Sequence, residues 1–289
     1  MKIIDMRCRP AYLHPFFGGA PGTPEHDTAR WLNRRVGTRG ADNHFERSLT
    51  PEGFLAEVRD AGLYRAVVVG RHTPSQHLPN ERIQAVVQGH EALIGIGSVE
   101  PALQGIDAAL AEVDRAVDQL GLAGIDLEPG FGDPARHPDD PLYWPLYGHL
   151  QARGIPLFLM SGPTTPDPAY NDPGRLAAVA RAFPQLPIVV YHGYWPNVQQ
   201  ALGVAFRYPN IHLVPDMYLF LPGSEGYVQA ANGFLADQLL FGSSYTFRPI
   251  RQSIEDAQRL GLGLGLGLGL RDEVLEKFFH GNAARLFKL

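Results

Sequence analysis

Residues 187–193 read Pro-Ile-Val-Val-Tyr-His-Gly, a short apolar run that ends at a histidine. Such a run is typical of a strand buried on both faces of a parallel sheet. Seven more runs of this kind are spread along the 289 residues, with helix-like segments between them. They are Ile3–Met6, Arg65–Val69, Leu93–Gly97, Gly124–Leu127, Pro156–Leu159, Ile211–Val214 and Gln238–Phe241. Eight alternating units predict a parallel sheet with crossover helices.

The length of the chain indicates how these units are arranged. One α/β barrel typically needs about 250 residues, and no polar linker divides the 289 residues into two parts. We therefore predict a single (β/α)8 TIM barrel that spans residues 1–289 as one domain. Two doubly wound domains are the alternative.

Two stretches interrupt the regular pattern. Residues 10–49 separate the first strand from the first helix and are too long for a plain connection. Because loops after barrel strands lie on the active-site face, we expect a lid or pocket wall there, with a surface excursion as the alternative. Residues 261–270 are five Gly-Leu pairs, interpreted as a low-complexity loop before a C-terminal helix at Arg271–Phe279, which His280-Gly281 would close.

The composition excludes several classes of partner. The net charge is −5, and no run of lysine or arginine is longer than two, so we expect no nucleic acid or anionic membrane as partner. The chain has one cysteine, Cys8, no stretch of 18 apolar residues and no signal-peptide pattern. We therefore expect a cytoplasmic protein without disulfides or membrane spans.

Polar and aromatic residues follow the predicted strands. In a barrel of this type, the reacting side chains come from the carboxyl ends of the strands and from the loops behind them. The residues found there are Arg7, Arg9, Arg71, His72, Glu100, Glu128, Met160, Ser161, His192, Tyr194, Trp195, Asp216, Tyr218, Ser244, Tyr245 and Arg248. We expect these side chains to surround one mouth of the barrel.

Arginine is concentrated among these candidates. Arg7 and Arg9 are two residues apart on a strand, so both face one side together with Asp5, while Met6 and Cys8 face the other. The other cations are Arg71, His72, His192 and Arg248. Guanidinium groups suit carboxylates, so we expect a small organic anion as substrate. Internal ion pairs of the arginines with Asp5, Asp126 and Glu128 are the alternative.

Three residues are candidates for catalysis. His192 and Asp216 are candidate general bases, with a satisfied core histidine and a turn-forming acid as the alternatives. Ser244 is a candidate nucleophile on the condition that His192 lies within hydrogen-bond reach. We expect pocket walls, or core aromatics, at Tyr194, Trp195, Tyr218 and Tyr245.

Several motifs resemble those of one enzyme group. Asp5-Met6-Arg7-Cys8-Arg9 is similar to the Asp-x-His-x-His opening of the amidohydrolase superfamily, with arginine at both histidine positions. Residues 241–247, Phe-Gly-Ser-Ser-Tyr-Thr-Phe, resemble its Phe-Gly-Ser-Asp-Tyr-Pro-Phe signature, and residues 280–286 resemble its closing segment. The resemblance is to the amidohydrolase-related branch that holds aminocarboxymuconate-semialdehyde decarboxylase-like enzymes and pyrone-dicarboxylate lactonases.

The metal site that this resemblance implies falls on unsuitable residues. The ligand positions correspond to Arg7, Arg9, Met160, His192 and Ser244. Arginine has no lone pair to offer, and methionine and serine are poor zinc ligands, so only the histidine is a plausible ligand. The expectation is a protein without a metal ion or other cofactor.

The resulting hypothesis is a metal-independent hydrolase that opens a lactone or related ester in a small carboxylated molecule. In it, His192 or Asp216 activates water, Arg7 and Arg9 hold the carboxylate or the developing oxyanion, and Arg71 and Arg248 orient the substrate. One alternative is a metal-dependent decarboxylase or hydrolase of the same family, and another is a degenerate barrel that binds an organic anion without reaction. Because dimers are common among such proteins, a homodimer is also expected.

Overall fold

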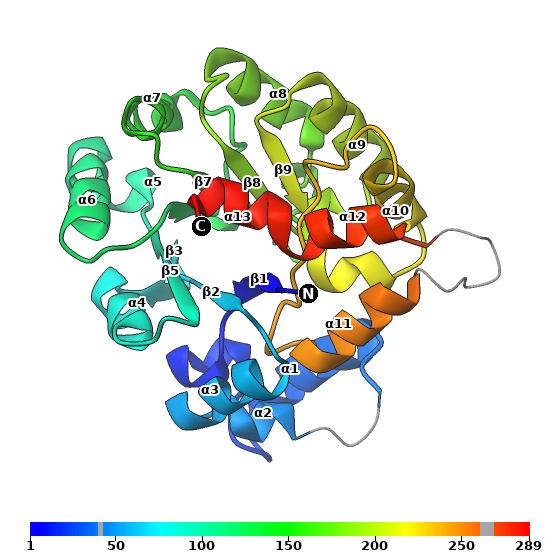
Figure 1. The fold of residues 1–289 in the computed structure, drawn as a ribbon. Helices are drawn as coiled ribbons and strands as arrows, with labels where there is room; N and C mark the ends of the chain where they lie inside the picture. Colours follow the sequence, from blue (N-terminus) through cyan, green and yellow to red (C-terminus); the bar gives the residue numbers. More distant parts are fainter. Residues whose placement is uncertain (40–42, 261–268) are drawn as a thin grey trace.

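The computed structural model describes residues 1–39, 43–260 and 269–289, and its centre is a ring of parallel strands (Figure 1). Seven strands form one sheet in chain order. They are β1 (Ile4–Cys8), β2 (Arg65–Val69), β5 (Leu93–Ser98), β6 (Ile125–Leu127), β7 (Leu157–Met160), β8 (Ile188–Tyr191) and β9 (Ile211–Val214). Each of these strands lies within one or two residues of a predicted run.

Residues 238–245 close the ring between β9 and β1. Leu239 forms a parallel bridge with Leu213, and Tyr245 forms one with Cys8. The Met6 N–H also donates to the Phe241 carbonyl at 3.0 Å. The eighth predicted strand therefore occupies its expected position, as isolated bridges rather than a continuous strand. This closed order confirms the (β/α)8 barrel and excludes two doubly wound domains.

Most helices surround the ring on its outer side, while α12 and α13 cross one end of it (Figure 1). In the described residues the helices are α1 (Pro24–Arg35), α2 (His44–Arg47), α3 (Pro51–Asp60), α4 (Asn80–Val87), α5 (Pro101–Gln104), α6 (Ile106–Asp118), α7 (Trp144–Arg153), α8 (Pro173–Ala182), α9 (Val198–Arg207), α10 (Glu225–Ala231), α11 (Ile250–Arg259), α12 (Asp272–Glu276) and α13 (Asn282–Phe287). Capping residues determine where several of these helices begin or end. The Thr50 hydroxyl accepts from the Gly53 N–H at the start of α3, and Gly154 ends α7 in a left-handed conformation. None of the helices in the described ranges is both long and apolar enough to cross a membrane.

The core has two parts, because alternate residues of each strand face opposite sides. An inner cluster fills the ring with Ile4, Met6, Val67, Val69, Ile96, Phe158, Met160, Val189, Tyr191, Val214 and Leu240. An outer cluster packs the other strand face against the helices, and it includes Val68, Val190, Phe54, Val113 and Leu150. Burying both faces explains why the predicted runs are almost continuously apolar.

The carboxyl-terminal helices cover the amino ends of the strands. Ala283, Ala284 and Phe287 pack against the inner cluster, and the Phe287 ring stacks on Phe158 with 6.2 Å between centroids. The sequence predicted a helix at Arg271–Phe279 that ends at His280-Gly281, and this predicted end is wrong. A π-helical turn at Lys277–Gly281 leads directly into α13, and the Asn282 side chain donates to the Leu239 carbonyl.

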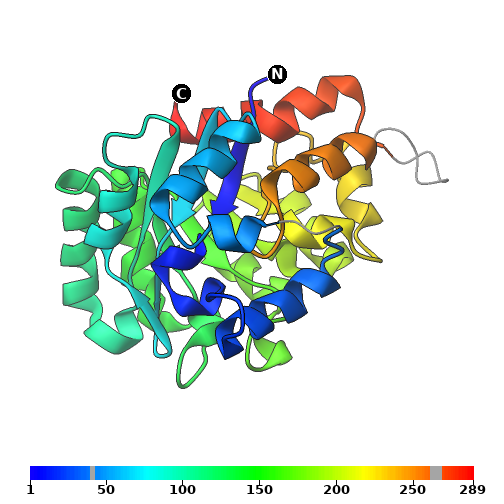
Figure 2. The ribbon, with the colours of Figure 1, turned by 90° about the horizontal axis from the view of Figure 1, so that it is seen from below.

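Residues 10–39 and 43–49 follow β1, and α1 among them lies at the opposite end of the barrel from α13 (Figure 2). This segment, which we call the β1–α3 insertion, contains two 3₁₀ turns, α1 and α2. The Asn33 amide donates to the Phe247 carbonyl at 2.9 Å, so the insertion contacts the closing segment of the ring. Of the predicted Gly-Leu loop, residues 261–268 lie outside the described residues.

Candidate functional site

A β-bulge in β1 sets the direction of the two N-terminal arginines. Asp5 pairs with Ala66 and Cys8 with Val68, so β1 carries one extra residue against β2. Met6 packs in the inner cluster and Cys8 in the outer one. The expected strict alternation is therefore wrong, because the bulge changes the face of the residues after Met6. Asp5 forms no ion pair with an arginine of the described residues: its Oδ1 accepts the backbone N–H groups of Arg7 and Ser243.

Arg9 belongs to a buried ion-pair network. Its Nη2 donates to Glu128 at 2.6 Å and Asp126 at 3.1 Å, and to the Gly70 carbonyl at 2.6 Å. Arg71 approaches the second carboxylate oxygen of Glu128 at 2.9 Å. Although burial acts to raise it, Arg71 and Arg9 lower the pKa of Glu128 to about 2. For Arg9, the alternative of internal ion pairing therefore holds.

Arg7 has different surroundings. Its Nη2 lies 3.6 Å from the Met160 sulfur, and its guanidinium lies over the Tyr191 ring at 5.0 Å from the centroid. No carboxylate of the described residues forms an ion pair with it, and its buried Nε has no hydrogen-bond partner there. Burial and the neighbouring Arg9 charge lower the pKa of Arg7 below its ordinary value. Arg7 is thus a buried cation with unused donors, the arrangement that favours an anionic ligand.

His192 and Asp216 form a buried pair at the ends of β8 and β9. The His192 Nδ1 lies 2.9 Å from a carboxylate oxygen of Asp216, and the His192 backbone N–H donates to the other oxygen at 3.2 Å. Burial lowers the pKa of His192 even though Asp216 acts to raise it. The imidazole is therefore neutral at pH 7. With the Nδ1 proton assigned to the Asp216 contact, Nε2 carries the free lone pair of a general base.

The backbone around this pair is strained. His192, Tyr194, Asp216 and Ser244 all have positive φ angles, of 64°, 66°, 41° and 60°. Non-glycine residues rarely adopt this region, and such residues gather at functional sites.

Gly242 permits a close approach of the two halves of the site. A Cβ at this position would lie 3.2 Å from the Asp216 Cβ and 3.5 Å from the Arg7 Cβ. Both side chains therefore begin at the same point of the ring. Consequently, the histidine–aspartate pair and the unpaired arginine are neighbours.

Two predicted wall residues lie beside His192. The Tyr218 ring meets the imidazole edge-on at 5.0 Å, and the Trp195 ring stacks on Tyr218 at 5.2 Å with 4° between planes.

The Ser244 hydroxyl is buried and has no hydrogen-bond partner among the described residues. The condition set for a nucleophilic serine, a hydrogen bond to His192, is thus not met.

Four predicted substrate contacts lie away from this cluster. Tyr194 and Tyr245 belong to the outer cluster, and the Tyr245 hydroxyl donates to the His44 carbonyl. Arg248 pairs with Asp256 of α11 and donates to the Val36 carbonyl, so it fixes the β1–α3 insertion.

His72 is the fourth of these residues, and it faces a groove on the outer side of the ring. It lies in a hairpin that was not predicted, made of β3 (Arg71–Thr73) and β4 (Gln76–Leu78). Its ring stacks on His77 at 4.1 Å, at the wall of a groove of about 390 Å³. Because β3 alternates, Arg71 faces Glu128 while His72 faces outward.

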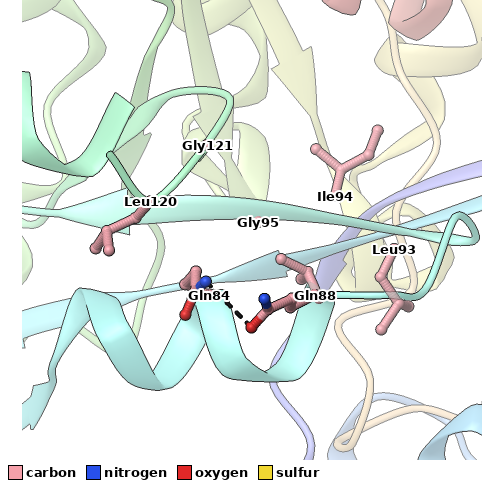
Figure 3. Close-up of a pocket in the computed structure, with 8 residues that line it drawn as sticks. Gln84, Gln88, Leu93, Ile94, Gly95, Leu120 and Gly121 are labelled. Carbon is pink, nitrogen blue, oxygen red and sulfur yellow. Dashed lines mark hydrogen bonds between the residues drawn. The ribbon is translucent and has the colours of Figure 1, made fainter. Parts of the chain in front are cut away.

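A second outer pocket carries no acid–base chemistry. It has a volume of about 350 Å³ and lies between α4 and β5, where Gln84 and Gln88 hydrogen-bond to each other (Figure 3). Its lining residues include no ionisable side chain. This pocket therefore offers no candidate for acid–base catalysis.

The side chains at the implied ligand positions do not fit a metal ion. The Arg7 guanidinium, which can only donate, contacts the Met160 sulfur, and Arg9 is taken up by two carboxylates. Residues 1–39, 43–260 and 269–289 contain no group of three or more histidine, cysteine, aspartate or glutamate side chains placed to hold a metal.

Two kinds of residue near the site were not among the candidates for catalysis or substrate binding, although a lid or pocket wall was expected in residues 10–49. Phe16 and Phe17 of the β1–α3 insertion lie over the Arg71 and Arg9 guanidiniums at 5.4 and 5.7 Å. Tyr191 ends the predicted strand, and its buried hydroxyl has no partner among the described residues. The Pro15-Phe16-Phe17 run was the available signal for the first kind, whereas Tyr191 looked like an ordinary core residue.

Comparisons with known proteins show the family and the fold of the chain. A family model described as amidohydrolase matches residues 4–289, so the chain belongs to the amidohydrolase family. No curated protein matches the chain. Among solved structures, it is similar to an uncharacterised TIM-barrel protein from Bordetella bronchiseptica, with 35% identity, a TM-score of 0.86 and coverage of 100% of this chain and 99% of that one.

Two functionally named structures share the fold at lower identity. One is a 2,6-dihydroxybenzoate decarboxylase, with 18% identity, a TM-score of 0.67 and full coverage of both chains. The other is a 4-oxalomesaconate hydratase from Rhodopseudomonas palustris, with 17% identity, a TM-score of 0.65 and coverage of 99% of this chain and 95% of that one.

Proposed function

We propose that this chain is an enzyme that acts on a small organic carboxylate without a metal ion, and that its reaction is the hydrolysis of a lactone or related ester. The observation that carries the proposal is the position of Arg7. The side chain of Arg7, a buried guanidinium with an unused donor, starts beside that of Asp216, and Asp216 holds one nitrogen of the neutral His192. A general base beside an unpaired cation suits the addition of water to a carbonyl group.

In the proposed reaction, His192 is the base. Its Nε2 takes a proton from water, and the water oxygen adds to the lactone carbonyl carbon. Asp216 holds the Nδ1 proton and stabilises the imidazolium that forms. The ring C–O bond then breaks, and the leaving oxygen takes up a proton to give a hydroxy acid. Lactones suit this site because their activated ester needs less electrophilic help than an amide.

In the same proposal, Arg7 stabilises the negative charge that develops on the carbonyl oxygen. It is available because no carboxylate of the described residues pairs with it. Arg71, with its unused Nε, binds a carboxylate of the substrate. Phe17 and Phe16 of the β1–α3 insertion lie over the guanidiniums of Arg9 and Arg71 and shield these two groups from water. Substrate entry then requires this insertion to move.

Turnover of carboxylated lactones tests the proposal. Purified protein is assayed with a panel of five- and six-membered lactones that carry a carboxylate, before and after exhaustive chelation. We expect hydrolysis that chelation does not reduce. Uncharged lactones of the same ring size are the control and should react at least 10-fold more slowly. Loss of activity on chelation, with recovery on addition of zinc or manganese, would contradict the proposal.

Decarboxylation is the second candidate function, and the observation that favours it is the reaction named for several structures of the same fold. They include a 2,6-dihydroxybenzoate decarboxylase and a 5-carboxyvanillate decarboxylase from Sphingomonas paucimobilis. The same lactone panel, extended with hydroxylated aromatic acids and monitored for carbon dioxide, separates the two reactions. A third outcome, a rise in melting temperature with every acid but no turnover, would indicate an anion-binding barrel without activity.

The remaining expectations are part of the proposal as well. We propose a cytoplasmic location, a small organic anion as ligand, no nucleic acid or membrane partner, and a homodimer. Light scattering at several concentrations measures the oligomeric state directly. A monomer at all concentrations would remove the dimer from the proposal without affecting the site.

A further inference from the structure

Two carboxyl groups at the end of β6 have unequal surroundings. Asp126 and Glu128 are two residues apart, both are almost fully buried, and both contact Arg9. Glu128 receives the shorter contact from Arg9, at 2.6 Å, and a second one from Arg71 at 2.9 Å. Asp126 receives a single contact from an arginine, at 3.1 Å, on Oδ2. Glu128 is therefore the carboxylate that both Arg9 and Arg71 neutralise.

The second oxygen of Asp126 has no such support. Its Oδ1 is buried without a hydrogen-bond partner among the described residues. An ionised carboxylate in this position would leave half of its charge unsolvated, which is costly in a buried site. A protonated carboxyl group has one O–H, which can bond to the neighbouring Glu128 carboxylate at rest and be given to a ligand during the reaction. Of the two acids, Asp126 is thus the one that keeps a proton.

The charges around Asp126 agree with this assignment. Burial and the neighbouring Glu128 carboxylate raise the pKa of Asp126 well above its ordinary value, against the opposing effects of Arg9 and Arg7. Tyr191 lies nearby as well, and burial keeps its hydroxyl neutral by raising its pKa. Among the described residues, Arg9 and Arg7 act to lower the pKa of Asp126, but burial and Glu128 outweigh them.

We propose that Asp126 is a neutral carboxylic acid that serves as the proton donor of this site. The inference rests on the proposed lactone hydrolysis. While His192 takes the proton of the attacking water, Asp126 gives its proton to the ring oxygen as the acyl C–O bond breaks. After product release, Asp126 regains a proton from solvent and His192 loses one to it. The net change is one lactone and one water to one hydroxy acid.

A pair of matched variants tests the charge of Asp126. Asp126→Asn exchanges a neutral acid for a neutral amide, whereas Glu128→Gln removes a charge that supports two arginines. We expect the melting temperature of Asp126→Asn to stay close to that of the wild type at pH 7, and that of Glu128→Gln to fall clearly. The infrared difference spectrum, wild type minus Asp126→Asn, should show the carbonyl stretch of a protonated carboxyl group. Its absence would overturn the proposal, whether or not a lactone substrate is found.

Kinetics then test the proton transfer. With a lactone whose leaving alcohol is poorly acidic, Asp126→Asn should lower kcat about 100-fold with little change in KM. With a phenol or enol ester, whose leaving oxygen needs no proton, the same variant should lose less than about 5-fold. A merely structural role would reduce both substrates equally, and that result would overturn the proposal. Failure of every wild-type assay would refute the proposed function alone, because the infrared band reports the Asp126 proton independently.

Discussion

The Nδ1 atom of His192 lies 2.9 Å from a carboxylate oxygen of Asp216, and both residues hold their backbone in the left-handed region. The same carboxylate also accepts the His192 backbone N–H. Two hydrogen bonds from one residue to one carboxylate fix both the ring orientation and the tautomer. Such a fixed imidazole is prepared to accept a proton on Nε2 without reorganisation.

Replacement of His192 by glutamine removes this base. We expect kcat to fall by about 10²- to 10⁴-fold. The wild-type pH profile of kcat/KM should have an acid limb with its midpoint below 6.5, the ordinary pKa of histidine, because burial lowers the pKa of His192. The measurement is a pH series on a carboxylated lactone. An acid limb above pH 7 in the wild type, or an unchanged limb in the variant, would contradict the assignment.

The same shift affects stability. In the unfolded chain, histidine titrates near its ordinary pKa of 6.5, whereas folded His192 titrates lower. Below pH 6.5 the unfolded chain therefore binds more protons, and the free energy of unfolding should decrease as the pH falls through this window. Asp5, whose pKa burial raises from 3.8 to about 6, acts in the opposite direction between those values. Urea titrations of the wild type and His192→Gln at pH 7.5 and 5.5 isolate the histidine, because Asp5 contributes equally to both proteins.

Replacement of Arg7 by methionine removes the unpaired cation and keeps an apolar stem of similar length. Loss of a hydrogen bond to a charged group costs about 1.5 to 3 kcal/mol, so we expect kcat/KM for carboxylated lactones to fall about 10- to 100-fold. Arg7→Lys keeps the charge but loses the forked donors, so its kcat/KM should lie between those of the wild type and the methionine variant. Equal activity of the methionine variant and the wild type would show that Arg7 does not contact the substrate.

The sequence was sufficient to predict the barrel and the position of its mouth. Continuous apolar runs mark strands buried on both faces, and polar residues at their ends mark the site. His192 and Asp216 were found in this way because each directly follows a regular strand. Their pairing, however, was not predicted, since it depends on two strands whose relative register is set by the closed ring.

The direction of several side chains was beyond prediction because it depends on backbone irregularities. The bulge in β1 changes the face of Arg7 relative to Met6. Positive φ angles at Tyr194 and Ser244 break the alternation after their strands, and Tyr194 ends up in the outer cluster. The ion pair that removes Arg248 from the site involves α11, a contact between parts of the chain whose approach only the fold defines.

Substitution of Gly242 by alanine tests the close approach at the centre of the site. A Cβ there would lie 2.7 Å from the Val214 Cγ1 and 3.2 Å from the Asp216 Cβ. We expect a loss of about 1 to 3 kcal/mol in the free energy of unfolding, as for other overpacked cores. Gly203→Ala is the control, because this exposed glycine of α9 has no atom within 4 Å of an added Cβ and should gain stability. Equal effects of both substitutions in urea unfolding would contradict the tight contact.

Glu128 supports the arginines of the network, so its neutralisation should be costly. Glu128→Gln leaves Arg9 and Arg71 without their shared counterion in a buried site. Breaking a buried ion pair from one side typically costs about 3 to 5 kcal/mol, and we expect a loss of this size in urea unfolding. Glu255→Gln is the matched control, since its pair with Arg259 is solvent-exposed and has an N–O distance of 3.8 Å, and such pairs contribute about 0 to 1 kcal/mol. A loss no larger than that of the control would mean that Asp126, not Glu128, carries the charge that balances the arginines.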